Sequence, residues 1–138
     1  HDPYFWFIER HWKLGENLLK YAFRGTPFRP MILRLLGVQI GRKVYDDGSV
    51  ITEKTLTRIG DGCCINQDVS IQAHSLEDGL FKSDRIEIGP GTSLGTSSYI
   101  HYGTHLGANT VIAPDTFVMK GTETEPNSVW HGNPARRC

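Results

Sequence analysis

His74 is the residue of this sequence best suited to proton transfer, because it begins a polar segment in which Glu77 and Asp78 follow closely. An imidazole accepts and returns a proton near neutral pH, as acyl transfer to an amine requires. A carboxylate on its other ring nitrogen would fix the tautomer and favour the imidazolium that forms. From spacing alone, His74 could equally be an ordinary loop residue.

The composition restricts the partners of such chemistry. The 138 residues include 15 basic and 15 acidic side chains, so no net charge attracts the chain to nucleic acid. The apolar run at residues 4–8 is far shorter than a membrane-spanning helix, and the start lacks a signal-peptide pattern. Cys63 and Cys64 are adjacent and Cys138 is terminal, which predicts no disulfide framework and suits a reducing compartment.

A six-residue repeat must position these side chains. Aliphatic residues recur at this interval, with a Ser or Thr four residues after each of the first five: Ile88, Leu94, Ile100, Leu106, Ile112 and Val118. Ile59, Ile65 and Ile71 show the same spacing. An even period preserves the alternation of strand side chains, and helical periods do not fit. We therefore expect short strands and bends in triangular coils, in which the Gly or Asn that follows an aliphatic residue accommodates the backbone geometry of the turn.

Other segments depart from the repeat. Residues 3–22 and about 29–36 have helical spacing and predict a cap over the coils, with a helix at a membrane surface as the alternative. Residues 40–58 predict a distorted first coil, and 73–85 an excursion loop. The expected organisation is a helical cap at 1–36, a β-helix at 37–121 and a tail at 122–138.

The Ile-Gly-x-x-x-x units and the segment Gly132–Arg136 resemble the hexapeptide-repeat acyltransferases, over residues 36–135. The resemblance implies an all-β fold, a left-handed parallel β-helix with an N-terminal helical cap; the hand comes from the family, since ordinary parallel crossovers are right-handed. More narrowly, several segments are similar to the tandem C-terminal domains of nonribosomal peptide synthetases of the ε-poly-lysine synthetase type. They are Leu35–Arg42, Val44–Asp47, Ile51–Glu53, Ile71–Gly79, Phe81–Asp84 and Met119–Gly121.

This resemblance implies an enzyme that joins an aminoacyl thioester, carried on 4′-phosphopantetheine, to an amino-acid amine without a bound cofactor. His74 would be the general base, oriented by Glu77 or Asp78, and backbone N–H groups would hold the oxyanion. The alternatives are a CoA-dependent O- or N-acetyltransferase and a non-catalytic scaffold. The implied partners are a carrier domain and sibling domains, in a trimer or an intramolecular pseudo-trimer. The parent protein would be membrane-bound, with this domain on the cytoplasmic side.

Further candidate residues come with the same resemblance. Acidic side chains around the expected cleft would recognise a cationic acceptor, or would be solvated turn carboxylates: Asp46, Asp47, Glu53, Glu77, Asp78 and Asp84. Lys82 opposes them. The remaining substrate-binding candidates are Asn66, His101, Tyr102 and Trp130. No metal is expected, because His101 and His105 take different places in the repeat and need not converge on zinc.

Overall fold

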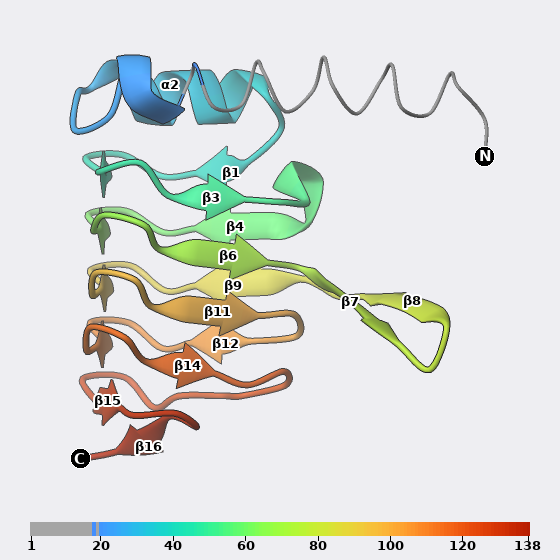
Figure 1. The fold of residues 1–138 in the computed structure, drawn as a ribbon. Coiled ribbons are helices and arrows are strands. Elements are labelled where there is room, and N and C mark those ends of the chain that lie inside the picture. The colour runs from blue at the N-terminus through green and yellow to red at the C-terminus, as the bar shows by residue number, and fades with distance from the viewer. Residues whose placement is uncertain (1–17, 19) are drawn as a thin grey trace.

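The computed structural model describes residues 18 and 20–138. Most of them form a stack of coils with three faces (Figure 1). Each face is a sheet of parallel strands, except that the last strand of face B is antiparallel. Face A contains β1 (Gln39–Ile40), β4 (Thr57–Ile59), β9 (Ile86–Ile88) and β12 (His105–Leu106). Face B contains β2 (Tyr45–Asp46), β5 (Cys64–Ile65), β10 (Ser93–Leu94), β13 (Val111–Ile112), β15 (Val129–His131) and β16 (Arg136–Arg137). Face C contains β3 (Val50–Ile51), β6 (Ser70–Gln72), β11 (Tyr99–His101) and β14 (Phe117–Val118).

The aliphatic residues of the repeat form the core. All of them are at most 4% exposed: Ile59, Ile65, Ile71, Ile88, Leu94, Ile100, Leu106, Ile112 and Val118. The strands that carry these residues alternate, so that in β11 Ile100 is buried between two half-buried neighbours. Residues 88–118 form strands and turns without a helix, which confirms the structure predicted from the six-residue period.

The small hydroxyl residues fill the interior corners. Five of them are at most 1% exposed: Thr92, Ser98, Thr104, Thr110 and Thr116. The Thr104 hydroxyl donates to the carbonyl of His101 at 2.7 Å, and the Thr110 hydroxyl donates to the carbonyl of Gly107 at 2.8 Å. These bonds allow a polar side chain to be buried in a crowded position at little cost.

The glycines that follow the repeat aliphatics have a different role from the one expected. Gly60, Gly89 and Gly107 are not among the residues with positive φ. A Cβ on Gly89 would lie 2.7 Å from the carbonyl oxygen of Leu106 in the next coil, and the other two glycines are equally crowded. The expectation that they accommodate turn geometry is therefore wrong: they allow adjacent coils to approach closely.

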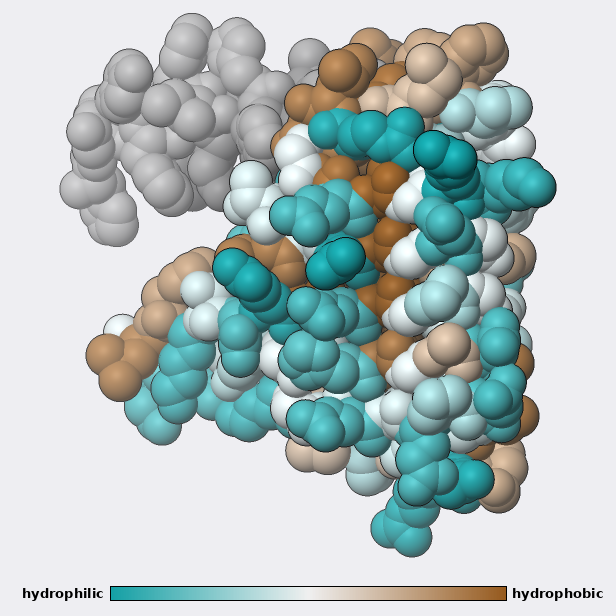
Figure 2. All heavy atoms as spheres, turned by 180° about the vertical axis from the view of Figure 1, so that it is seen from behind, coloured by the Kyte–Doolittle hydropathy of each residue, from teal (hydrophilic) through white to brown (hydrophobic). Residues whose placement is uncertain are grey.

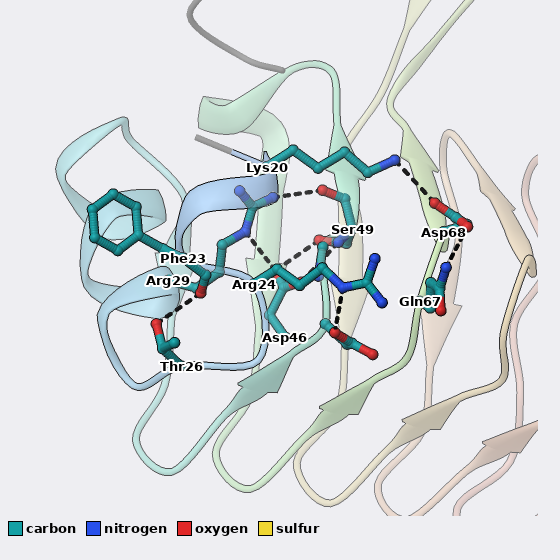
Figure 3. Close-up of polar contacts among 11 residues, drawn as sticks. Lys20, Phe23, Arg24, Thr26, Arg29, Asp46, Ser49, Gln67 and Asp68 are labelled. Atoms are coloured by element: carbon teal, nitrogen blue, oxygen red, sulfur yellow. Dashed lines mark hydrogen bonds and ion pairs between the residues drawn. The ribbon is translucent and has the colours of Figure 1, made fainter. Parts of the chain in front are cut away.

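The first coil is joined to an N-terminal helical segment. Helix α2 (Phe28–Leu35) buries Leu33 against the core and ends before Gly37, which has φ +107°. Figure 3 shows Arg29 reaching β2: its guanidinium donates to the carbonyl of Ser49 at 2.6 Å and lies 3.7 Å from the Asp46 carboxylate. The helix expected at 3–22 lies outside the described residues except for 18 and 20–22, which are helical.

Two segments differ from the simple stack. The excursion at 73–85 is a β-hairpin of β7 (His74–Glu77) and β8 (Leu80–Ser83), which projects from the coils in Figure 1. Its two-residue turn at Asp78 and Gly79 has positive φ at both positions, as tight hairpins require. The expected tail at 122–138 instead extends face B, because β15 pairs in parallel with β13. The expected first coil is present as β1–β3, followed by a 3-10 turn at Lys54–Leu56.

No helix within the described part of the chain is long and apolar enough to cross a membrane.

Candidate functional site

One edge of the stack gathers the residues capable of chemistry. It is the edge at which the chain passes from face C to face A, and it is called here the C–A edge. Face C aligns Ile51, Ile71, Ile100 and Val118 in one buried column. Residues one or two positions beyond the ends of these strands therefore lie at the C–A edge: Glu53, His74, Tyr102 and Lys120.

His74 is held by a carboxylate from the preceding coil. Its Nδ1 lies 2.5 Å from Glu53 Oε1, and the other Glu53 oxygen accepts a hydrogen bond from the Thr52 hydroxyl. Both side chains are about one-quarter exposed, at 27% and 24%, so solvent only partly screens the pair. The contact favours a proton on Nδ1 and leaves the Nε2 lone pair available to accept a proton.

The hairpin covers one side of the imidazole. The Phe81 ring stacks on His74 with centroids 5.0 Å apart and an interplanar angle of 19°. Within the described residues, no hydrogen bond is formed by His74 Nε2. The arrangement therefore presents a basic nitrogen beside an apolar wall. Figure 2 shows the hairpin projecting from the stack with hydrophobic residues at its end; these exposed residues are Leu76, Leu80 and Phe81.

The structure corrects the expected orienting residue. Glu77 does not pair with His74. Lys120 Nζ donates hydrogen bonds to both Glu77 carboxylate oxygens, at 2.6 and 2.8 Å, and Lys82 Nζ lies 3.4 Å from one of them. Asp78 forms the hairpin turn with φ +52°. The reason is strand geometry, because residues 74 and 77 point to opposite faces of β7. Glu53, expected only as a substrate-binding residue, holds the ring instead.

A polar and aromatic network supports the edge from face C. The Tyr99 hydroxyl donates to Gln72 Oε1 at 2.5 Å, and the Gln72 amide donates to the backbone carbonyl of His74 at 3.2 Å. Burial raises the pKa of Tyr99, and the Glu53 charge adds to this. Burial lowers the pKa of His101, although a hydrogen bond with the backbone of His74 opposes the shift. Both groups therefore favour their neutral forms near neutral pH.

The aromatic rings continue along the edge. Tyr99 stacks on Phe117 with centroids 5.1 Å apart, and His101 meets Tyr102 edge-on at 4.7 Å. Lys120 Nζ lies 5.8 Å from the centroid of the Tyr102 ring. Of the sequence-predicted residues, the C–A edge thus brings together Glu53, His74, Glu77, Lys82, His101 and Tyr102.

Four other predicted acidic or amide residues have structural partners. Asp46 is fully buried and accepts hydrogen bonds from the Ser49 amide and hydroxyl at 2.8 and 2.7 Å. Asp47 pairs with Arg24 at 2.9 Å. Asn66 donates to a backbone carbonyl of the next coil at 2.7 Å. Asp84 accepts from the following backbone N–H at the base of the hairpin. The expectation that Asp46 and Asp47 line the cleft is wrong, because they anchor the N-terminal segment.

Trp130 also lies away from the edge. It belongs to β15 on face B, where its indole donates to the Ser128 hydroxyl at 2.9 Å and packs against the core. Two surface hollows of about 490 and 440 Å³ lie along face A beside Gly60, and neither is lined by His74. Among the described residues, no group of three or more potential metal ligands comes together.

Four members of the site were not predicted from the sequence: Gln72, Tyr99, Phe81 and Lys120. Gln72 and Tyr99 are sequence neighbours of the repeat aliphatics Ile71 and Ile100, and Lys120 lies two residues after Val118. Aligning the repeats by their aliphatic residues could therefore have identified all three. Phe81 could not be found this way, because the hairpin interrupts the repeat.

Comparison with known proteins adds one sequence relative. No protein-family model matches the chain. Over 119 residues, 86% of this chain, it is 40% identical to the Delta-poly-L-ornithine synthetase of Acinetobacter baumannii (strain AB307-0294). The chain spans only 9% of the length of that protein.

Solved structures give the fold. A hexapeptide-repeat acetyltransferase from Vibrio cholerae has a TM-score of 0.69 at 19% identity, covering 90% of this chain and 87% of that one. A galactoside acetyltransferase in complex with coenzyme A has a TM-score of 0.68 at 22% identity, covering 91% and 78%. The Vibrio cholerae O1 biovar eltor enzyme complexed with acetyl coenzyme A gives 0.63 at 17% identity, covering 88% and 82%. The chain therefore has the left-handed β-helix fold of hexapeptide-repeat acetyltransferases.

Proposed function

We propose that this chain is an acyltransferase domain in which His74 removes a proton from the attacking nucleophile. The observation that carries the proposal is the contact between His74 Nδ1 and Glu53 Oε1 at the base of the projecting hairpin. A histidine held by a carboxylate, with its second nitrogen free, is the arrangement that general base catalysis needs. The likeness to acetyltransferase folds supports the choice of acyl transfer over other proton-transfer reactions.

The reaction has a simple balance. An amine nitrogen attacks the thioester carbonyl carbon while His74 Nε2 accepts the amine proton. Glu53 stabilises the imidazolium, and backbone N–H groups of the coils hold the oxyanion. The tetrahedral intermediate then collapses, the C–S bond breaks, and the imidazolium returns its proton to the leaving thiolate. The products are an amide and a free thiol, and no covalent bond to the protein is required.

The proposed substrates are an aminoacyl thioester on a 4′-phosphopantetheine carrier and an amino-acid amine. Support comes from the 40% identity to a stretch of a poly-ornithine synthetase, whose name describes the synthesis of a cationic amino-acid polymer. We place the chain in a larger, membrane-bound synthetase, on the cytoplasmic side, with a carrier domain and sibling domains as partners.

A CoA-dependent O- or N-acetyltransferase is the second candidate. The galactoside acetyltransferase structure contains coenzyme A and the Vibrio cholerae O1 biovar eltor structure contains acetyl coenzyme A. Both candidate functions use the same base. The donor separates them. Transfer from an ornithyl-loaded carrier but not from acetyl coenzyme A would favour the synthetase function, and the reverse would favour the acetyltransferase.

The decisive variant is His74→Ala. We expect single-turnover transfer from a loaded donor to a free amine to fall by about 100-fold or more, because the proton acceptor is lost. Glu87→Gln is the matched control, since this exposed carboxylate lies on face A beside His105. Transfer by His74→Ala at the wild-type rate would reject the base and favour a scaffolding role.

We also propose that the site is completed by a neighbouring β-helix, either in a trimer or between sibling domains. The exposed apolar end of the hairpin beside an open His74 supports this arrangement. Light scattering that gives a monomer at all concentrations, together with a parent whose domains do not touch, would contradict it.

A further inference from the structure

The far side of the hairpin contains a second cluster that the proposed chemistry leaves unused. Glu77 leaves β7 on the face opposite His74 and meets the turn after β14. Its two oxygens receive the Lys120 ammonium at 2.8 and 2.6 Å, and the same ammonium lies 5.8 Å from the Tyr102 ring centroid. A carboxylate and an aromatic face converging on one nitrogen form a recognisable binding geometry for a primary ammonium group.

We propose that Glu77 and Tyr102 form a subsite for the alkylammonium group of a cationic substrate, and that Lys120 occupies this subsite when substrate is absent. The inference rests on the proposed function, because that function supplies a substrate with such a group. Glu77 and Tyr102 are called the ammonium subsite below.

The charge state of the cluster agrees with this role. The hydrogen bond with Lys120 lowers the pKa of Glu77, and the same bond raises the pKa of Lys120. The pair is therefore fully ionised near neutral pH. A ligand group that replaces Lys120 must accordingly be positively charged. This requirement excludes amino acids whose side chains are uncharged.

The pair is also built for exchange. The side chains of Lys120 and Glu77 are 43% and 30% exposed, and ion pairs at this degree of exposure contribute little to stability. Lys120 lies in a turn on a long flexible side chain, so it can leave without disturbing the stack. Lys82, at 3.4 Å, provides a weaker second cation to the same carboxylate.

The position relative to His74 gives the subsite its use. Residues 74 and 77 are separated by about 10 Å along the strand. His101 links the proposed base to the ammonium subsite, because it forms a hydrogen bond with the backbone of His74 and its ring contacts the ring of Tyr102. An ammonium held at Glu77 would therefore lie close to the reacting centre without contacting it. The subsite would position a cationic acceptor or the side chain of a growing cationic chain.

Calorimetric titration of the 138-residue chain tests the proposal directly. The probes are L-ornithine, a tri-ornithine peptide, and L-norvaline, which has the ornithine carbon skeleton without the side-chain ammonium. We expect the first two to bind and L-norvaline to bind at least about tenfold more weakly, because the charge-assisted hydrogen bond is absent. The ratio of ornithine to tri-ornithine affinity distinguishes a free acceptor from a growing chain.

Three variants and one control sharpen the test. Glu77→Gln should weaken ornithine binding by about tenfold or more. Tyr102→Leu should weaken it about two- to fivefold. Lys120→Met should strengthen it about two- to fivefold, because the internal competitor is gone. Glu87→Gln, on face A, should bind as wild type does.

The outcomes separate this inference from the proposed function. Unchanged ornithine binding in Glu77→Gln, or weaker binding in Lys120→Met, would overturn the ammonium subsite. Loss of binding in Glu77→Gln together with wild-type transfer by His74→Ala would support the subsite and reject the proposed base.

Discussion

The regular wall at residues 88–118 and the C–A edge are built from the same coils but follow opposite rules. In the wall, every repeat aliphatic is buried and the inward hydroxyls are almost completely enclosed. At the edge, two partly exposed carboxylates pair across coils: Glu53 with the His74 imidazole and Glu77 with the Lys120 ammonium group. The hairpin is the extreme case, because all four residues of β8 are exposed.

This difference shows how a repeat fold separates stability from chemistry. Each coil of the wall contributes one aliphatic residue from each of its three faces to the core. The stabilisation from burying these residues is therefore distributed over the whole stack. The edge needs only the turn residues, which vary without disturbing the column beneath them. His74 can therefore project from the second coil while Ile71 remains fully buried three residues earlier.

The largest expected effect is on the wall. Ile100→Asp places an unpaired carboxylate in a fully buried position and should lower the free energy of unfolding by about 3–5 kcal/mol. Chemical denaturation measures it. Leu80→Asp, at the exposed hairpin end, is the matched control and should change stability little; equal losses in both variants would erase the distinction between wall and edge.

Glycines sharpen the same comparison. Gly89→Ala should lower the free energy of unfolding by about 1–3 kcal/mol, because the new methyl group meets the backbone of the next coil. Gly79→Asn should be nearly neutral, since the hairpin turn is open and Asn tolerates positive φ. Thermal unfolding of both variants is the measurement, and a neutral Gly89→Ala would show that the coils can move apart.

An edge substitution should change chemistry and leave the fold intact. Glu53→Gln removes the charge that stabilises the His74 imidazolium, so we expect transfer to slow by about tenfold or more with unchanged unfolding. Single-turnover rates and denaturation curves give the two quantities. Normal transfer by this variant, alongside inactive His74→Ala, would mean that Glu53 only packs against the ring.

The smallest expected effect is a pH dependence at the edge. The folded-state pKa of Glu77 lies below its ordinary value of 4.5, so its pair with Lys120 stabilises the fold above that value. The contribution is lost as pH falls through the lowered pKa. The stability difference between wild type and Glu77→Gln should therefore be small at pH 7 and shrink as the pH falls below 4.5, and a difference that does not shrink would have another origin.

The predictability of the two regions from sequence follows the same division. The wall could be predicted because the aliphatic residues from Ile88 to Val118 recur with a fixed period, and this period alone indicates which side chains are buried. The partner of His74 could not be predicted by proximity in sequence, because stacking brings Glu53, 21 residues away, against the ring. Glu77 is only three residues from His74, yet strand alternation directs it to the other face.

The C-terminal strand has a consequence for self-association. Parallel coils leave an unpaired strand edge at each end, and such edges can template the addition of further chains into fibres. Here β16 pairs antiparallel with β15, through Trp130 with Arg137 and His131 with Arg136. The reversed direction and exposed arginines present an edge that does not repeat the pattern of the coils below. Within the described residues, β16 therefore covers the edge of face B with a strand that does not favour the addition of a further parallel strand, and the purified 138-residue chain should resist fibril formation on storage.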